Sequence, residues 1–173
     1  MPKADGRKSG EGPRASRFWR CSHLRERFTL SVSVFVIVRS GKHVLLLRRA
    51  NSGWKDGFFS LPAGAHDGSE TLAAAAAREL EEETSLRAEE QDMRLVHLLH
   101  CNAGDSGGEW LGVFFQAQRW SGEPTLVERG THDQIGWYSI DDLPPNTIAY
   151  TRQGIELGLQ QISFSEYGWR LPA

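Results

Sequence analysis

Between Phe28 and Val38 apolar and small polar residues alternate, and this pattern limits how the chain can fold more than any other stretch. Apolar residues stand at the even positions, and Thr or Ser stands at positions 29, 31 and 33. Successive side chains of a β-strand point to opposite faces of a sheet, so a period of two predicts a strand with one buried face. Such a sheet needs a covering layer, which the rest of the sequence must supply.

Helix-like and strand-like stretches follow in a mixed order. Residues 69–83 are the clearest helix, because Ser69 can cap the first turn and five consecutive alanines follow. Strands are predicted on both sides of this helix, and this order favours an α/β fold in which helices cover a mixed sheet. The other predicted strands are His43–Leu47, Phe58–Phe59, Arg94–Cys101, Trp110–Trp120 and Ile135–Tyr138, and the second predicted helix is Ile148–Ile162.

Length and composition fit one domain at residues 18–173, preceded by a flexible basic leader at residues 1–17. The chain has 173 residues, of which 39% are hydrophobic and 24% charged. No apolar run approaches the roughly 20 residues that cross a bilayer, and no secretory signal is recognisable. Two cysteines are too few for a disulfide framework or a zinc site. We therefore expect a cytoplasmic protein that does not interact with membranes.

The charge is divided unevenly along the chain. Residues 1–27 contain eight Lys or Arg and three Asp or Glu, a charge of +5, so the net charge of −2 leaves −7 on the remainder. The basic segment could touch nucleic acid or acidic lipid, but its composition favours a solvated leader, and no stable nucleic-acid partner is expected. An acidic body binds polyphosphate poorly without a cation, which is a first indication of metal dependence.

Three glutamates near the end of the predicted helix carry the chemistry. Glu79, Glu82 and Glu83 stand at i, i+3 and i+4 and therefore share one helix face. Their charges repel one another, and the helix dipole disfavours anions at this end. A divalent cation such as Mg²⁺ removes both objections, because it prefers carboxylate oxygens together with phosphates and water. Glu81 points about 100° away from Glu82 and is interpreted as a solvated neighbour. The alternative is that the whole acidic run is a solvated face.

The full spacing of this segment resembles the Nudix box. The box runs Gly, five residues, Glu, seven residues, Arg-Glu, an aliphatic residue, any residue, Glu-Glu, any residue, Gly and an aliphatic residue. Ser85 stands where the family usually has Gly, and we expect it to cost some backbone strain without removing a catalytic group. The positions in register are Gly64, Glu70, Arg78, Glu79, Leu80, Glu82, Glu83 and Leu86.

The resemblance implies a Nudix-type α/β/α sandwich with a mixed central sheet and a pyrophosphohydrolase that acts on nucleoside diphosphates linked to another group. It implies that Glu79, Glu82 and Glu83 bind the metal, with a general base among them. Arg78 and Glu70 would support the catalytic carboxylates. Gly64 would bring its backbone close to metal and substrate. The implied cofactor is Mg²⁺, with Mn²⁺ as a substitute.

Two further residues are predicted in the site from a likeness to the MutT-type branch of the family. Glu128, after Trp120-Ser-Gly-Glu-Pro-Thr-Leu-Val, would add a carboxylate to the metal site, although a surface acid is an equal alternative. Asn146, after Asp141-Asp-Leu-Pro-Pro, would bind the base, since an amide offers both a donor and an acceptor. The alternative for Asn146 is a helix cap.

Three functions remain open. The leading hypothesis is a MutT-like enzyme that converts a canonical or modified nucleoside triphosphate to monophosphate and pyrophosphate. ADP-ribose or a nucleotide sugar is the alternative substrate, although residues 100–104 lack the proline or tyrosine that marks ADP-ribose or dinucleoside-polyphosphate hydrolases about 16 residues beyond the box. A non-catalytic nucleotide sensor is the third. The aromatic segment Phe164–Trp169 could dock on the domain or support a homodimer.

None of the six histidines is assigned to the site. His97 and His100 lie on one predicted strand and point to opposite faces, which argues against joint ligation. His66 is interpreted as a surface loop residue. The tryptophans Trp110, Trp120 and Trp137 could stack on a base, but we favour core or sheet-edge positions for them. Trp54, Phe58 and Phe59 are expected to pack beneath the box.

Overall fold

The computed structural model describes residues 28–102 and 108–169, which form nine strands, two α-helices and two 3-10 helices. The leader predicted at residues 1–17 and most of the Gly-rich loop at 102–108 lie outside the described residues. The elements are β1 (Ser31–Ile37), β2 (Arg39–Ser40), β3 (His43–Arg49), β4 (Phe59–Ser60), β5 (Ala63–Ala65), α1 (Leu72–Thr84), η1 (Glu90–Asp92), β6 (Met93–Cys101), β7 (Trp110–Ala117), β8 (His132–Ser139), η2 (Ile140–Asp142), α2 (Ala149–Leu159) and β9 (Phe164–Tyr167).

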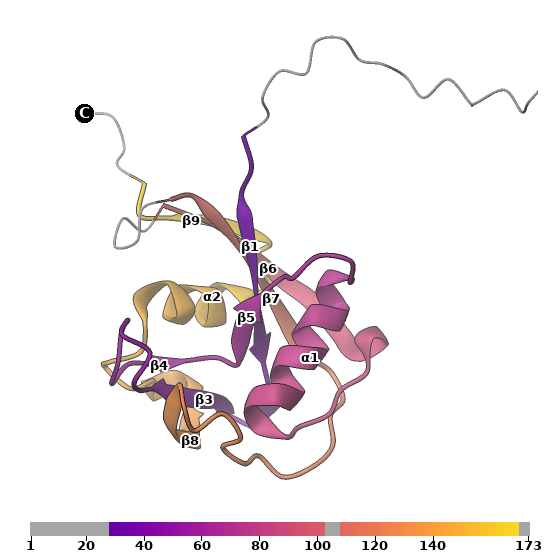
Figure 1. The fold of residues 1–173 in the computed structure, drawn as a ribbon, viewed down its shortest axis with the longest axis vertical. Helices are drawn as coiled ribbons and strands as arrows, with labels where there is room; N and C mark the ends of the chain where they lie inside the picture. The colour runs from indigo at the N-terminus through magenta and orange to yellow at the C-terminus, as the bar shows by residue number, and fades with distance from the viewer. Residues whose placement is uncertain (1–27, 103–107, 170–173) are drawn as a thin grey trace, which may run out of the picture.

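A five-stranded sheet in the order β5-β1-β7-β6-β9 lies between the two helices (Figure 1). The pairs β1–β7 and β6–β9 are parallel and the other two pairs are antiparallel, so the sheet is mixed. The period of two in β1 separates its faces as the sequence predicts. Val34 and Val36 belong to the core cluster under α1, whereas Phe35 and Ile37 belong to the cluster under α2. The predicted α/β/α sandwich with a mixed sheet is confirmed.

A smaller antiparallel sheet is built around β3, which pairs with β2, β4 and β8. Val44 and Leu46 of β3 contribute to the core on the α2 side, and Leu45 contributes to the core on the α1 side. At the end of this ladder the register shifts and places Arg49 opposite His132. The small sheet therefore places Arg49 and His132 side by side, and His132 faces Glu83 of α1.

The predicted N-terminal cap of the first helix is wrong. Thr71, not Ser69, is the N-cap, and its hydroxyl accepts a hydrogen bond of 3.0 Å from the Ala74 amide. Ser69 lies in the left-handed region at φ 60°. The later start leaves Glu70 outside the helix, where its carboxylate can reach back to Arg78.

Other helices and strands begin or end at residues different from those predicted. The second helix runs from Ala149 to Leu159 and has Ile148 as its N-cap without a side-chain hydrogen bond, so a capping role for Asn146 is excluded. The strand expected at residues 135–138 begins earlier, at His132. No helix among the described residues is both long and apolar enough to cross a bilayer.

Candidate active site

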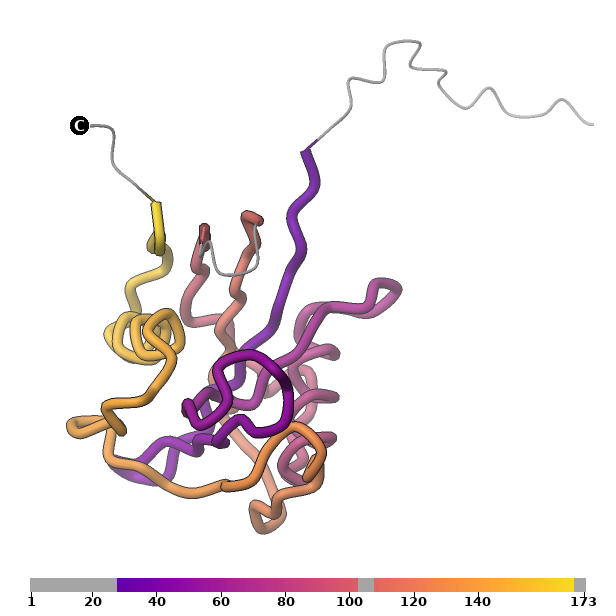
Figure 2. Tube along the Cα trace, turned by 60° about the vertical axis from the view of Figure 1, so that its left-hand side comes forward, coloured from indigo at the N-terminus to yellow at the C-terminus, as the bar shows by residue number. Residues whose placement is uncertain are grey.

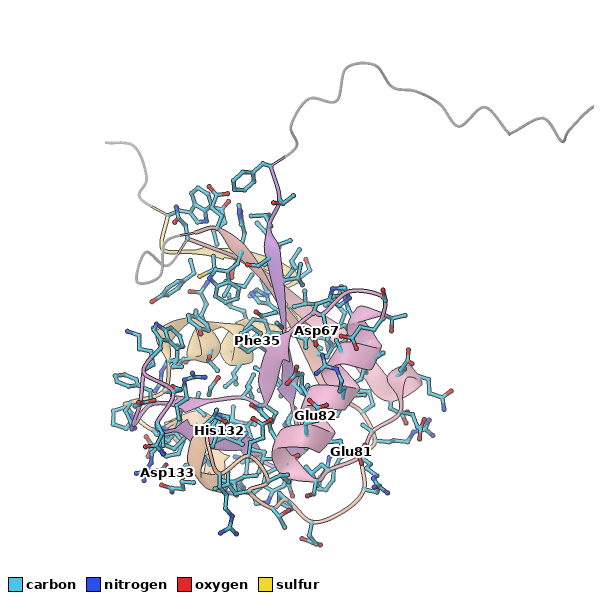
Figure 3. The ribbon with its side chains drawn as sticks, viewed as in Figure 1. Phe35, Asp67, Glu81, Glu82, His132 and Asp133 are labelled. Carbon is cyan, nitrogen blue, oxygen red and sulfur yellow. The ribbon has the colours of Figure 1, made fainter. Side chains whose placement is uncertain are left out.

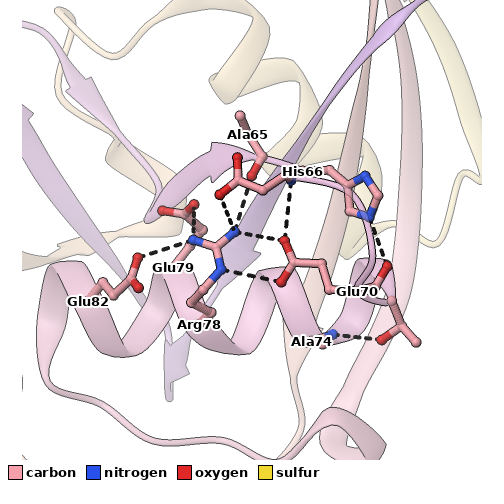
Figure 4. Close-up of polar contacts among 9 residues, drawn as sticks. Ala65, His66, Glu70, Ala74, Arg78, Glu79 and Glu82 are labelled. Atoms are coloured by element: carbon pink, nitrogen blue, oxygen red, sulfur yellow. Dashed lines mark hydrogen bonds and ion pairs between the residues drawn. The ribbon is translucent and has the colours of Figure 1, made fainter.

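Arg78 gathers the carboxylates on the outer side of α1 (Figure 4). Its Nη1 donates to Glu79 at 2.6 Å and to Glu82 at 3.1 Å, and its Nη2 donates to Glu70 at 3.0 Å and to the Ala65 carbonyl at 3.2 Å. The hydrogen bond from Arg78 to Glu70 lowers the pKa of that carboxyl and raises the pKa of the guanidinium. This network, which we call the Arg78 cluster, offsets the repulsion between neighbouring acids.

Glu79 lies against the backbone of β5. Its carboxylate occupies the space beside Gly64, where an added Cβ would overlap the carboxylate atoms. The Glu79 side chain is 13% exposed, and its burial raises its pKa despite the hydrogen bond from Arg78. The absence of a side chain at position 64 is therefore what lets this acid approach the strand.

Glu83 is the most deeply buried of the acids. Its side chain is 7% exposed, and Oε2 accepts a hydrogen bond of 2.9 Å from the Ala63 amide. Burial, followed by the charges of Glu79 and Glu128, raises the pKa of Glu83 to about 8. A carboxylate in this setting is expensive to ionise unless a cation is bound beside it.

The loop before β8 lies against the end of α1 (Figure 2). The Thr125 amide donates to the Thr84 carbonyl and the Val127 amide donates to the Glu83 carbonyl, so the loop is fastened to the last helical turn. Ligand atoms of Glu83, Glu128 and His132 all lie within 4.8 Å of one another. Burial, and then the nearby Arg49 charge, lower the pKa of His132. We call these three residues the His132 cluster.

The donors present suit a divalent cation. Glu79 and Glu83 provide buried carboxylates with raised pKa values, and Glu128 adds a third carboxylate at the same place. Carboxylate oxygens are the preferred protein ligands of Mg²⁺ and Mn²⁺. Glu82 is half-exposed and bonded to Arg78, whereas Glu81 leaves α1 on another side and binds Arg87 at 2.7 Å (Figure 3).

Ser85 ends α1 in a left-handed conformation at φ 61°. This is the backbone position that glycine adopts without a steric penalty, and Ser85 therefore carries the strain expected from the sequence. Its hydroxyl is 2.8 Å from the Thr125 hydroxyl, which ties the cap to the loop before β8. The departure from the box thus affects the helix end and removes no carboxylate.

An aromatic pocket of about 700 Å³ opens on the opposite face of the sheet, towards α2. Trp54 and Tyr150 stack at 6.4 Å between ring centroids, and Trp110 meets Tyr150 edge to face at 5.1 Å. Trp54 Nε1 is buried and has no hydrogen-bond partner among the described residues. An unpaired buried donor of this kind calls for an acceptor from outside the chain. The residues that line the pocket include Ser31, Ser33, Phe35, Trp54, Lys55, Phe58, Trp110, Thr147, Tyr150 and Tyr167.

The pocket and the carboxylates lie on the two sides of the edge strand β5. Ser33 and Phe35 line the pocket and pair with Ala65 and Ala63 of β5, and Gly64 between them faces Glu79. The strand β5 therefore separates the pocket from the carboxylates.

Arg49 stands between the two regions. Its guanidinium lies 5.0 Å from the Trp54 ring centroid and donates to the Trp54 carbonyl at 3.0 Å. Its charge adds to the effect of burial in lowering the pKa of His132, and it offsets part of the rise in the pKa of Glu83. A phosphate placed between the pocket and the acids would therefore meet a cation.

The structure groups most of the predicted site residues. Gly64, Arg78, Glu79 and Glu83 meet at the junction of β5 and α1, and Glu128 joins them from the loop before β8. Asn146 lies at the pocket side instead, between two pocket-lining residues, and its Nδ2 donates to the Gly57 carbonyl at 2.6 Å.

Two residues of the site were missed by the sequence analysis. Arg49 lies beyond the predicted strand His43–Leu47 and was not singled out, and His132 was not distinguished from five other histidines. The four-residue spacing between Glu128 and His132 was the available signal, but it becomes meaningful only when the loop is fastened to α1. Of the other histidines, His97 is buried and bonded to Ile162 and Ser165, far from any acid named above.

The aromatic residues divide between the pocket and the α1 side of the core. Trp110 and Trp54 line the pocket, whereas Trp120 and Trp137 pack against each other at 5.8 Å on the α1 side of the core. The preference for structural positions fits all three tryptophans, because Trp110 also packs against the core on the α2 side. Trp110 lines the pocket as well, and stacking of a base on it stays a prediction.

The chain belongs to the Nudix family, because the model of the NUDIX domain matches residues 27–156. Nudix hydrolases depend on divalent metal ions, and they act on nucleoside diphosphates linked to another group. The family predicted from the box is thereby confirmed.

Particular relatives include the NAD-capped RNA hydrolase NudC of Citrobacter koseri, which is 30% identical over 133 residues, 75% of this chain and 49% of the relative. The chain thus spans about half the length of the curated relatives it matches. The MutT NUDIX hydrolase from Burkholderia pseudomallei is 28% identical with a TM-score of 0.69, over 75% of this chain and 98% of that one. The NUDIX domain of Shewanella oneidensis NrtR, solved with ADP ribose, shares the fold at 19% identity and a TM-score of 0.64, over 82% and 94% of the two chains.

Proposed function

We propose that this chain hydrolyses a nucleoside triphosphate, canonical or modified, to monophosphate and pyrophosphate with the help of divalent metal. The observation that carries the proposal is the placement of an aromatic pocket and a carboxylate site on the two sides of β5. A nucleotide has the same two halves, a flat base and a charged phosphate chain, joined by a ribose.

The pocket suits a nucleobase. Trp54 and Tyr150 offer aromatic faces for stacking, and the unpaired Trp54 Nε1 offers a donor to a base or ribose oxygen. The pocket volume of about 700 Å³ is in the usual range of roughly 300–1,000 Å³ for small-molecule sites. Asn146 beside the pocket fixes the Gly57 carbonyl and so supports the loop that carries Trp54 and Phe58.

The carboxylate site suits the phosphate chain. Divalent metal supplies charge neutralisation and an activated water when bound. Glu83 and Glu128 would hold it, with Glu79 and Glu82 on the neighbouring side. Glu79, buried, oriented by Arg78 and raised in pKa, is placed to accept the proton of the attacking water. Arg49 binds phosphate on the way from the pocket.

A dinucleotide pyrophosphate of the NAD type is a second candidate substrate. The observation that favours it is the likeness to NAD-capped RNA hydrolases, which extends over 133 residues. In that case one base would occupy the pocket and the second nucleotide would extend past the carboxylates. ADP-ribose and nucleotide sugars differ only in this second half.

Product analysis over a panel of nucleotides separates these candidates. Purified protein with Mg²⁺ or Mn²⁺ is incubated with the nucleoside triphosphates, NAD, ADP-ribose and a nucleotide sugar, and products are identified by phosphorus NMR. Monophosphate and pyrophosphate from a triphosphate, faster than turnover of any other panel member, is the expected result.

The same assay needs a variant that removes one carboxylate and a matched control. Glu83→Gln should abolish turnover, whereas Glu81→Gln, on the same helix and bonded to Arg87, should retain it. Preferential cleavage of NAD or ADP-ribose would reject the triphosphate. Absence of turnover with nucleotide binding intact would indicate a sensor.

A further inference from the structure

His132 is placed unlike the other residues of the site. It is the first residue of β8, its side chain is 4% exposed, and it faces the buried carboxylate of Glu83 with 3.8 Å between Nε2 and Oε1. That separation is too long for a hydrogen bond. Nε2 makes no hydrogen bond to any described residue, although the ring is almost wholly removed from water.

The hydrogen bonds of Thr131 determine which ring nitrogen carries the proton. Its hydroxyl lies 3.1 Å from Glu128 Oε2 and 3.1 Å from His132 Nδ1. A carboxylate can only accept, so the hydroxyl proton points to Glu128 and the hydroxyl oxygen accepts from Nδ1–H. In the tautomer that carries its proton on Nδ1, Nε2 presents a lone pair.

This lone pair and the oxygens of Glu83 and Glu128 are all electron-pair donors. One ligand atom of each of the three residues lies within 4.8 Å of the other two. A cation between them can be coordinated by all three. Metal-binding histidines nearly always donate their second ring N–H to a fixed partner, which is the arrangement that Thr131 provides here.

We propose that His132 is a nitrogen ligand, acting with Glu83 and Glu128, at a divalent metal position that favours Mn²⁺ or another transition metal over Mg²⁺. The inference rests on the proposed function, because it concerns the metal of the same site. Mg²⁺ takes oxygen ligands, whereas a site that combines imidazole nitrogen with carboxylates also suits first-row transition metals, and Mn²⁺ is the one among them that accepts carboxylate oxygens as Mg²⁺ does. The Arg78 cluster offers oxygen only, so the two clusters differ in the ions they suit.

Nitrogen ligation can be read directly on the wild-type protein. Bound Mn²⁺, added to the full chain without nucleotide, is examined by electron spin echo envelope modulation, with histidine at natural abundance or labelled with nitrogen-15. The expected result is a nitrogen modulation that changes with the label. No nitrogen modulation from stoichiometrically bound Mn²⁺ would overturn the proposal.

A variant assigns the signal to its residue. His132→Gln should remove the modulation and weaken Mn²⁺ binding, measured by calorimetry, by about 10- to 100-fold, while Mg²⁺ binding changes less than about threefold. His43→Gln, at an exposed position at the start of β3, is the matched control and should leave both affinities unchanged. Equal weakening for both ions would show a structural effect and reject selectivity.

The outcome is separable from that of the proposed function. Mg²⁺-supported hydrolysis of a nucleotide without nitrogen modulation would leave the hydrolase assignment standing and remove His132 from the ligands. Nitrogen modulation without hydrolysis of any panel nucleotide would keep His132 among the ligands and reject the hydrolase assignment.

Discussion

The two clusters at α1 hold carboxylates in opposite ways. The Arg78 cluster brings Glu70, Glu79 and Glu82 to a guanidinium that donates to each of them. The His132 cluster places Glu83 and Glu128 beside an imidazole whose pKa is lowered by burial. The chain neutralises the first set with its own cation and leaves the second set dependent on one from solution.

This difference separates positioning from metal binding within one short motif. The hydrogen bond from Arg78 lowers the pKa of Glu70, and burial raises the pKa of Glu79 against the effect of Arg78. Glu83 is buried without an arginine hydrogen bond, and its pKa is raised to about 8. The comparison therefore ranks the three glutamates of the box, which the sequence treats as equivalent.

The largest expected effect on activity comes from replacing one acid of each cluster, Glu83 of the His132 cluster and Glu82 of the Arg78 cluster. Glu83→Gln should lower kcat/KM on the order of 10³-fold, since it removes a buried metal ligand. Glu82→Gln should cost less, because Glu82 is half-exposed and already bonded to Arg78. Steady-state kinetics at saturating Mg²⁺ measure both, with Glu81→Gln as the control. Equal losses at 82 and 83 would break the distinction between the two clusters.

Gly64→Ala tests whether Glu79 needs its place against β5. The added Cβ overlaps the Glu79 carboxylate, which must move. Displacement of a catalytic group by about 1 Å costs roughly 10²-fold in rate, so kcat should fall by that order. Gly108→Ala, where the new methyl group meets open space, is the control. Full activity of Gly64→Ala would show that Glu79 tolerates other positions.

Arg78→Lys tests whether the Arg78 cluster needs a guanidinium that reaches several carboxylates. Lysine keeps the charge but loses the planar fork that reaches several carboxylates at once. We expect kcat/KM to fall about 10- to 100-fold, with Mg²⁺ affinity changed less than activity. The exposed Arg94→Lys serves as the control. A variant that loses Mg²⁺ binding in proportion to activity would place Arg78 in metal binding itself.

The pH dependence of stability reports on Glu83 in chelator-treated protein. Its pKa is raised from 4.5 to about 8 in the folded chain, so between these values the unfolded state releases the proton more readily. The free energy of unfolding should therefore fall as pH rises from about 4.5 to about 8, as measured by urea denaturation. Glu83→Gln should flatten this fall and Glu81→Gln should preserve it. An unchanged slope in Glu83→Gln would contradict the buried, unpaired carboxylate.

The smallest expected effect is a change in stability at Ser85, the residue that ends α1. Ser85→Gly relieves the left-handed strain at φ 61° but loses the hydroxyl contact with Thr125. We expect a net gain of about 0.5–1 kcal/mol in the free energy of unfolding and little change in kcat. Destabilisation would mean that the contact between the cap and the loop outweighs the strain.

The sequence predicted the elements that local pattern determines. The alternation in β1 and the alanines of α1 are signals within one element, and the spacing of the box identified Gly64, Arg78 and Glu79 before any coordinates. Boundaries failed where two caps competed, as at Ser69 and Thr71, because the choice depends on Glu70 reaching Arg78 across a turn.

Residues contributed by distant strands could not be ranked in the same way. His132 becomes a partner of Glu83 only through the ladder between β3 and β8 and the loop fastened to α1. Trp110 becomes a pocket residue because β7 pairs with β1 and α2 carries Tyr150 above it. Both contacts depend on tertiary topology, which periodicity does not report.

The central claim is that acids of the box and the loop before β8 bind divalent metal against a nucleotide phosphate chain. An anomalous-difference map from crystals grown with Mn²⁺ and a non-hydrolysable triphosphate analogue tests it most directly. The account predicts a peak in contact with Glu83, Glu128 and a phosphate oxygen, with the base among Trp54 and Tyr150. Mn²⁺ bound elsewhere, or a nucleotide outside the aromatic pocket, would contradict it.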